Sequence, residues 1–136
     1  MPVRHRVVLL SFVLWTAFVW ANRISNTLRS DESSGAKTFS TALSIVLLAF
    51  GLAVLVVTVR SWRRGLRDGG AKVLVAAAAV TIVVWLVRVP QIVIADHSVG
   101  FEVVHTVLGL VSIGLAVAVA RIATAARRAL RPGPPI

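Results

Sequence analysis

The stretch FSTALSIVLLAFGLAVLVVTV, residues 39–59, determines the fold class of this chain. It holds 21 residues without one charged side chain. A helix rises about 1.5 Å per residue, so about 20 apolar residues cross the roughly 30 Å hydrocarbon core of a bilayer. Nothing in the stretch shows the alternation of period two that is typical of a barrel strand. Residues 39–59 are therefore predicted to form a membrane-spanning helix.

Three further apolar blocks lie at about residues 7–24, 73–94 and 101–120. The last two are separated by the six-residue link ADHSVG, so these helices are expected to be packed neighbours. We predict an all-α membrane protein, a four-transmembrane-helix antiparallel bundle that forms a single domain over residues 1–131. The tail 132–136, PGPPI, cannot continue a helix and is expected to be disordered.

The composition agrees with a membrane protein and excludes several kinds of chemistry. The chain is 57% hydrophobic and 15% charged, whereas a soluble domain has about 45–50% apolar and about 25% charged residues. It contains no cysteine, which excludes disulfides, thiolate catalysis and cysteine-ligated metals. No P-loop, dinucleotide-binding glycine pattern or nucleophile elbow occurs. We therefore expect neither an enzyme nor a cofactor.

The cations are distributed unevenly between the two sides of the predicted bundle. Eleven lie on the side of the two termini: Arg4, Arg6, Arg60, Arg63, Arg64, Arg67, Lys72, Arg121, Arg127, Arg128 and Arg131. The opposite side has four cations and four of the five acids. Because cytoplasmic loops collect Lys and Arg, both termini are predicted to lie in the cytoplasm, with the chain in the plasma membrane.

The same cations suggest a binding surface. A basic patch of Arg60, Arg63, Arg64, Arg67, Arg121, Arg127 and Arg128 is expected to face anionic lipids or a partner protein, with Trp62 beside it. The net charge of +10 would suggest nucleic acid in a soluble protein, but here the topology of the loops explains it. We expect no nucleic-acid binding.

A second polar group interrupts the apolar blocks on the opposite side, in the stretch VRVPQIVIADHSVGFEVVHT, residues 87–106. Arg88 precedes Pro90, which removes an amide donor and is expected to kink the helix. Glu102 and His105 are three residues apart and share a helix face across the short link. We predict a polar cluster in the outer leaflet made of Arg23, Arg88, Asp96, His97, Glu102 and His105.

This polar cluster has four interpretations. An interhelical ion pair of Arg88 with Glu102 needs no activity and is the simplest. A proton or ion path is opposed by the lack of titratable residues in the cytoplasmic half of the spans. A metal site would use Asp96, His97, Glu102 and His105, but the Glu-x-x-His spacing occurs once where di-iron bundles need it twice. Haem ligation lacks histidines on facing helices, so no metal is predicted.

The residues VWANRI, 19–24, and ADHSVGFEVVHTVLGLVSIGLA, 95–116, carry a resemblance. Here the chain resembles small four-span integral membrane proteins of high-GC actinobacteria, in layout over its whole length. The resemblance implies a four-helix fold in the plasma membrane and transfers no functional residue.

The expected function is that of a non-enzymatic integral membrane protein, an accessory or scaffolding subunit of a larger membrane complex. The alternative is a small oligomeric transporter or channel for ions or small molecules, which would use the Arg/Glu/His cluster as its mouth. The expected partners are the lipid bilayer with its anionic lipids, and other membrane protein subunits or further copies of this chain.

Overall fold

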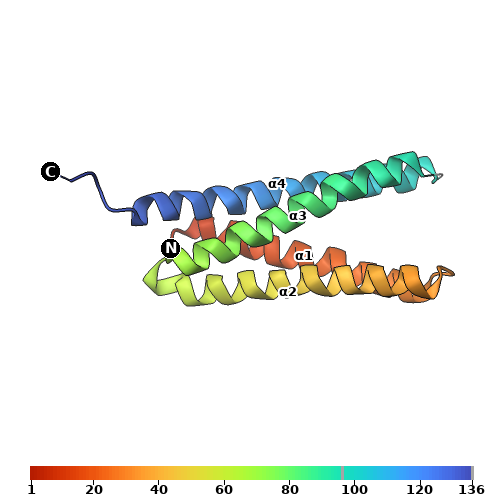
Figure 1. Cartoon of the computed structure of the whole chain (residues 1–136), viewed down its shortest axis with the longest axis horizontal. Coiled ribbons are helices and arrows are strands. Elements are labelled where there is room, and N and C mark those ends of the chain that lie inside the picture. The colour runs from red at the N-terminus through yellow and green to blue at the C-terminus, as the bar shows by residue number, and fades with distance from the viewer. Residues whose placement is uncertain (96, 136) are drawn as a thin grey trace.

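The computed structural model describes residues 1–95 and 97–135 and contains four helices within them. They are α1 (Val3–Arg29), α2 (Ser34–Arg64), α3 (Asp68–Ile94) and α4 (Val99–Leu130) (Figure 1). All four are long and apolar enough to cross a membrane, and no strand occurs in the described residues. The prediction of four helices is confirmed. Asp96 and Ile136, which belonged to the predicted cluster and tail, lie outside the described residues.

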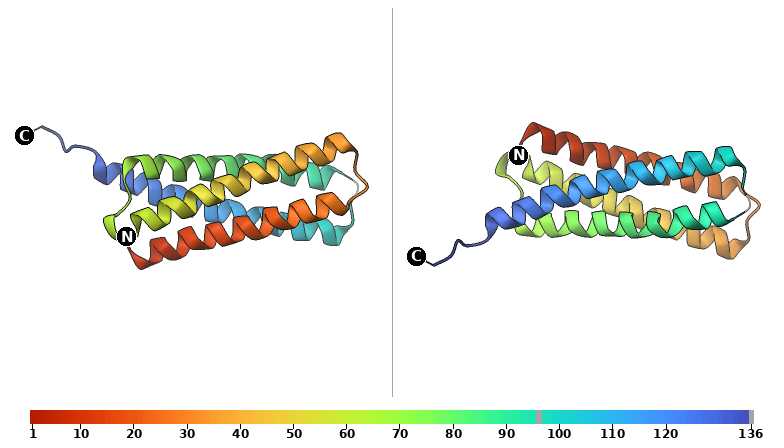
Figure 2. Two further views of the ribbon diagram at one scale, coloured as in Figure 1. Left: turned by 90° about the horizontal axis from the view of Figure 1, so that it is seen from below. Right: turned by 90° about the horizontal axis from the view of Figure 1, so that it is seen from above.

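The helices form two antiparallel hairpins, α1–α2 and α3–α4, and each hairpin packs most closely within itself. Further contacts of α1 with α4 and of α2 with α3 join the hairpins into a bundle (Figures 1 and 2). Both termini and the α2–α3 turn lie at one end, which we call the terminal end. The other two turns lie at the opposite end, the loop end, where the hairpins diverge in Figure 1.

Short polar segments begin and end the helices. Ser33 caps α2 by accepting a hydrogen bond from the amide of Ala36 at 3.3 Å, and Ser98 caps α4 through the amide of Phe101 at 3.2 Å. Gly65 ends α2 with a φ of 80°, a left-handed value that favours glycine. Residues 132–135 follow α4 without helix, so the predicted disorder of the tail stays a prediction.

The buried residues of α2 are spaced alternately by four and three positions, and spacings of three and four also predominate in the other helices. In α2 they are Ser40, Ser44, Leu47, Gly51, Val54, Thr58 and Ser61. This spacing lets long helices pack side by side at a shallow crossing angle of about 20°. Many other large apolar side chains, such as Leu14, Leu52 and Leu110, are exposed, as expected for helices whose outer surface meets lipid.

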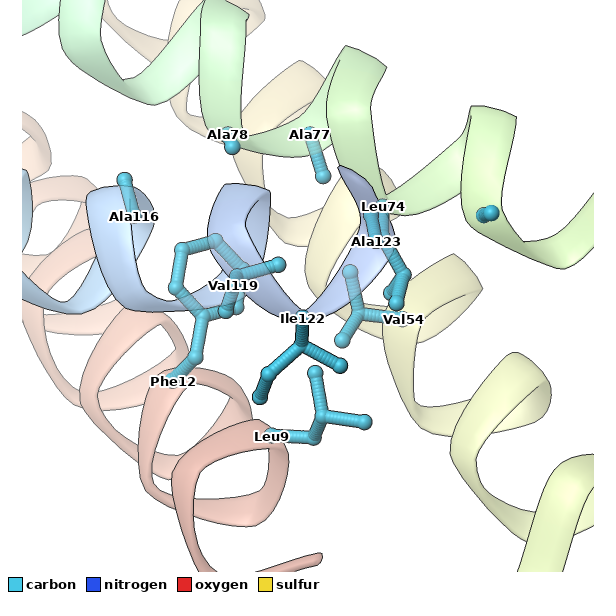
Figure 3. Packing of buried hydrophobic residues seen from close by; sticks show 11 residues of the cluster. Leu9, Phe12, Val54, Leu74, Ala77, Ala78, Ala116, Val119, Ile122 and Ala123 are labelled. Atoms are coloured by element: carbon cyan, nitrogen blue, oxygen red, sulfur yellow. The ribbon is translucent and has the colours of Figure 1, made fainter. Parts of the chain in front are cut away.

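The terminal half of the bundle has a close-packed core to which all four helices contribute. Leu9 and Phe12 of α1 meet Val54 of α2, Leu74 of α3 and Val119 of α4 (Figure 3). Small side chains of α3 and α4 bring these two helices together: Ala77, Ala78, Ala116 and Ala123. No charged residue of the described chain is buried, although the Nε of Arg6 is covered at this end.

Candidate functional site

Toward the loop end the interior is no longer close-packed, and a cavity of about 270 Å³ lies between α1, α3 and α4. Most of its walls are apolar, but they also carry guanidinium, imidazole and carboxamide groups. The lining residues are Phe18, Val19, Trp20, Asn22, Arg23 and Asn26 of α1, Trp85, Arg88 and Ile92 of α3, and Val104, His105 and Leu108 of α4. We call this the Arg–His cavity.

The three titratable side chains of the Arg–His cavity are each six residues from the loop end of their own helix. Arg23 is six residues before the end of α1 at Arg29, and Arg88 is six residues before the end of α3 at Ile94. His105 is six residues after the start of α4 at Val99. At about 1.5 Å per residue, each lies about 9 Å below the loop end of its helix.

Arg88 occupies a position that an apolar residue would take in an ordinary core. The buried residues of α3 include Leu74, Ala78, Thr81, Trp85 and Ile92. Arg88 lies three residues after Trp85 and four residues before Ile92, so it falls on the same face of the helix. Its helix position therefore faces the bundle interior and not the lipid. Charged residues within membrane spans are costly and usually face such an interior, where they mark a functional site or a pair.

The guanidinium and imidazole groups of the cavity keep nitrogen atoms that form no hydrogen bond within the described residues. The Nε of Arg23 donates to the Oγ of Ser40 in α2 at 3.1 Å, and that hydroxyl shares a hydrogen bond with Thr27 at 3.1 Å. The Nδ1 of His105 donates to the carbonyl oxygen of Phe101 at 2.8 Å, which leaves its Nε2 free. No hydrogen bond or ion pair between described side chains involves Arg88.

Two tryptophans that the sequence patterns did not indicate, Trp20 and Trp85, form the inner wall of the cavity. The rings of Trp20 and Trp85 lie 6.0 Å apart, and both side chains are buried. The indole nitrogen of Trp85 is a buried donor without a partner. The signal that could have identified Trp85 is its distance of three residues from Arg88, which places both on one face of α3.

The predicted ion pair between Arg88 and Glu102 is not formed. The ion pairs among the described residues join Asp68 to Lys72 at 3.3 Å and to Arg127 at 3.1 Å, at the terminal end. The register of α3 and α4 explains this difference. Gly109 lies against Trp85 and Val89, so Arg88 is level with about residue 108 of α4. Glu102 is six residues further toward the loop end, an offset of about 9 Å.

The two histidines of the predicted cluster are held apart by an aromatic ring. His97 stacks on Phe101 at 4.4 Å between ring centroids, and His105 stacks on the same ring at 3.9 Å. One face of a phenyl ring has no room for both imidazoles at these distances, so Phe101 lies between them. The geometry therefore separates the histidines that the metal interpretation would bring together. No group of three potential metal ligands occurs among the described residues.

Pro90 lies inside α3, and the helix continues past it to Ile94. The proline has no amide, so the carbonyl of Leu86 loses its helical donor next to Arg88. Pro90 itself is exposed and points away from the Arg–His cavity, whose lining does not include it. The kink expected at this position stays a prediction.

At the terminal end, most members of the predicted basic patch are exposed: Arg60, Arg63, Arg64, Arg67, Arg121 and Arg128. Arg127 is half-buried and bound to Asp68, which ties α4 to α3. Arg6, a further cation of this end, donates to the carbonyl oxygen of Trp62 at 3.0 Å and lies 4.4 Å above its ring. The bundle topology thus brings cations of α1, α2, α3 and α4 to one end.

The described lining of the Arg–His cavity offers hydrogen-bond donors and positive charge above an apolar wall, a combination that suits the binding of an anion. Comparisons with protein-family models, with curated proteins and with solved structures each found no match to this chain.

Proposed function

We propose that the chain is a non-enzymatic integral protein of the plasma membrane that serves as an accessory or scaffolding subunit of a larger membrane complex. Four helices of spanning length joined by short turns leave little of the chain outside a bilayer. The cations gathered at the terminal end support an orientation with both termini in the cytoplasm. The exposed arginines of that end would also attract anionic lipids of the cytoplasmic leaflet.

The observation that carries the subunit role is Gly114, in the apolar part of α4. It is exposed, and apart from its two chain neighbours and the nearby backbone of its own helix, no atom lies within 4 Å of the position that a Cβ would take. Glycine costs about 1 kcal/mol relative to alanine inside a helix, and nothing within the bundle compensates for that cost. Ala118, four residues on, is also partly exposed. Small residues at this spacing let the backbone of another helix approach closely.

Native purification in a mild detergent tests this role with a matched pair of variants. Gly114→Leu fits the folded chain, because the space around it is open, but would block the approach of a second helix. Gly100→Leu introduces the same side chain at another open glycine, in the first turn of α4. We expect a stoichiometric partner, or a second copy, with the wild type and with Gly100→Leu, and its loss with Gly114→Leu.

Two results would contradict the subunit role. One is a wild-type preparation that is a monodisperse monomer with no co-purifying protein. The other is a partner that is retained in full by Gly114→Leu.

The polar lining of the Arg–His cavity is the feature that favours the alternative function, an oligomeric transporter or channel. Within one chain the cavity ends above the close-packed core of Leu9, Phe12, Leu74 and Val119, so a pathway would have to run between chains. Flux into proteoliposomes that is abolished by Arg88→Ala would support transport, and flux unaffected by Arg88→Ala and Glu102→Gln would count against it.

A further inference from the structure

The Arg–His cavity combines two features that rarely occur together inside a bundle of apolar helices. Two guanidinium groups, Arg23 and Arg88, face an interior space, each six residues from the loop end of its helix, and most of the remaining wall is hydrocarbon or indole. We propose that this cavity binds one anionic amphiphile, a molecule with a phosphate or carboxylate head and an apolar body, which enters from the surrounding bilayer. This ligand site goes beyond the proposed subunit role and does not depend on it.

The positive charge of Arg23 and Arg88 favours the binding of an anion in the cavity. No Asp or Glu is among the lining residues in the described part of the chain, and Glu102 lies too far along α4 to neutralise Arg88. Glu32, in the α1–α2 turn, is close enough for its charge to act on Arg88, but it is exposed, forms no ion pair with Arg88 and does not line the cavity. A partly buried cation without a counter-ion is costly, and bringing an anion to it removes that cost. The planar donors of two arginines match the oxygens of a phosphate or carboxylate.

Further donors and apolar groups are placed to recognise the two parts of such a ligand. The buried indole nitrogen of Trp85 has no partner, although Trp85 lines the cavity. Asn26 adds a carboxamide on the side of α1. Ile92 and Leu108 supply hydrocarbon surface for the apolar body. Sites for small ligands commonly have this composition, a mainly apolar wall with a few convergent polar groups.

The exposed part of the lining shows where the cavity opens. Phe18, Asn22 and Asn26 of α1 and Val104 of α4 are exposed, whereas Trp85 and Ile92 of α3 are buried. The mouth therefore lies between α1 and α4, on the side of the bundle where a bilayer would be. The volume of about 270 Å³ is just below the range of about 300–1,000 Å³ typical of ligand pockets. It suits a head group with its first methylenes, while longer chains stay in the bilayer.

Native mass spectrometry of the purified chain in a neutral detergent tests the proposal. The probes are phosphatidylglycerol, phosphatidylcholine, hexyl phosphate and inorganic phosphate. We expect the wild type to retain one phosphatidylglycerol in preference to phosphatidylcholine, and hexyl phosphate to compete for it. Arg23→Gln and Arg88→Gln should each weaken this binding at least about tenfold, because each removes a charge-assisted contact.

Arg29→Gln is the matched control, since it removes the same charge from an exposed residue at the same end of the bundle. It should leave binding within about twofold of the wild type, as expected for a solvent-screened charge. Val104→Trp keeps every charge and narrows the mouth of the cavity, so it should weaken binding even if an arginine variant fails to fold.

The proposal would be overturned in three ways. Arg23→Gln and Arg88→Gln could bind phosphatidylglycerol as tightly as the wild type. Arg29→Gln could lose as much affinity as they do, which would show diffuse attraction. Inorganic phosphate could displace the lipid as well as hexyl phosphate does, which would identify a site for a soluble anion without an apolar body. Because the chain is tested alone, the loss of a protein partner would not affect the result.

Discussion

Replacing Gly109 by alanine should push α3 and α4 apart. A Cβ at this position would lie 2.7 Å from Cγ2 of Val89 and 2.9 Å from Cε3 of Trp85. Ordinary carbon–carbon contacts are about 3.5–4.0 Å, so the added methyl group needs a shift of close to 1 Å. Neither neighbour can yield easily, because valine is branched at Cβ and the indole of Trp85 is buried against Trp20.

The size of the effect follows from overpacking and helix propensity. Overpacking of a tight interior costs about 1–3 kcal/mol. Alanine is favoured over glycine in a helix by about 1 kcal/mol, which offsets part of that cost. Gly114→Ala, five residues on in the same helix, gains the same propensity without any clash. The difference in unfolding free energy between the two variants should therefore be about 1–3 kcal/mol, with Gly109→Ala the less stable.

The measurement is SDS-induced unfolding of both variants in mixed micelles, followed by circular dichroism. Tryptophan emission gives a second signal, because Trp85 is one of the two residues that the new methyl group would touch. If Gly109→Ala unfolds at the same SDS fraction as Gly114→Ala, or at a higher one, the close approach of α3 and α4 is wrong. The register that places Arg88 away from Glu102 would then also fail.

Two further predictions concern the core and the interface between the hairpins. Phe12→Ala should lower the unfolding free energy by about 3–5 kcal/mol because Phe12 is fully buried, whereas Phe18→Ala should change it little because Phe18 is exposed. SDS-induced unfolding compares the two variants, and equal losses of stability would contradict the assignment of Phe12 to the core. The Nε1 of Trp15 donates a hydrogen bond to the Oγ of Ser112 at 2.9 Å and so joins α1 to α4. A double-mutant cycle of Trp15→Phe with Ser112→Ala should give a coupling free energy of about 0.6 kcal/mol, and additive effects of the two substitutions would contradict this bond.

The apolar runs of the sequence predicted the number of helices but underestimated their lengths. Residues 39–59 mark the charge-free part of α2, but that helix runs from Ser34 to Arg64. The block at 101–120 belongs to an α4 that continues to Leu130. Hydropathy reports where lipid could surround a helix, whereas the backbone hydrogen bonds continue into the polar ends. Alanine and arginine are good helix formers, so ATAARRAL, residues 123–130, extends α4.

Three members of the predicted cluster, Arg23, Arg88 and His105, line the cavity, whereas His97 and Glu102 do not. The inward position of Arg88 follows from the buried residues Leu74, Ala78, Thr81 and Trp85, a face that the sequence does not reveal because α3 is apolar on every side. The failure of the Arg88–Glu102 pair depends on the register between α3 and α4, which the close contact of Gly109 shows. A six-residue link permits several registers, and hydropathy does not choose between them. The part played by Trp20 likewise depends on how α1 faces α3 across the bundle.

Cysteine labelling reports which end of the bundle faces the outside of the cell, and the chain suits it because it has no cysteine of its own. Single-cysteine variants are treated in intact cells with a membrane-impermeant maleimide. We expect Glu32→Cys and His97→Cys, in the two turns of the loop end, to be labelled. Arg67→Cys and Gly133→Cys, at the terminal end, should react only after the membrane is opened. Labelling of Arg67→Cys in intact cells, or of only one loop-end variant, would contradict a four-span bundle with both termini in the cytoplasm.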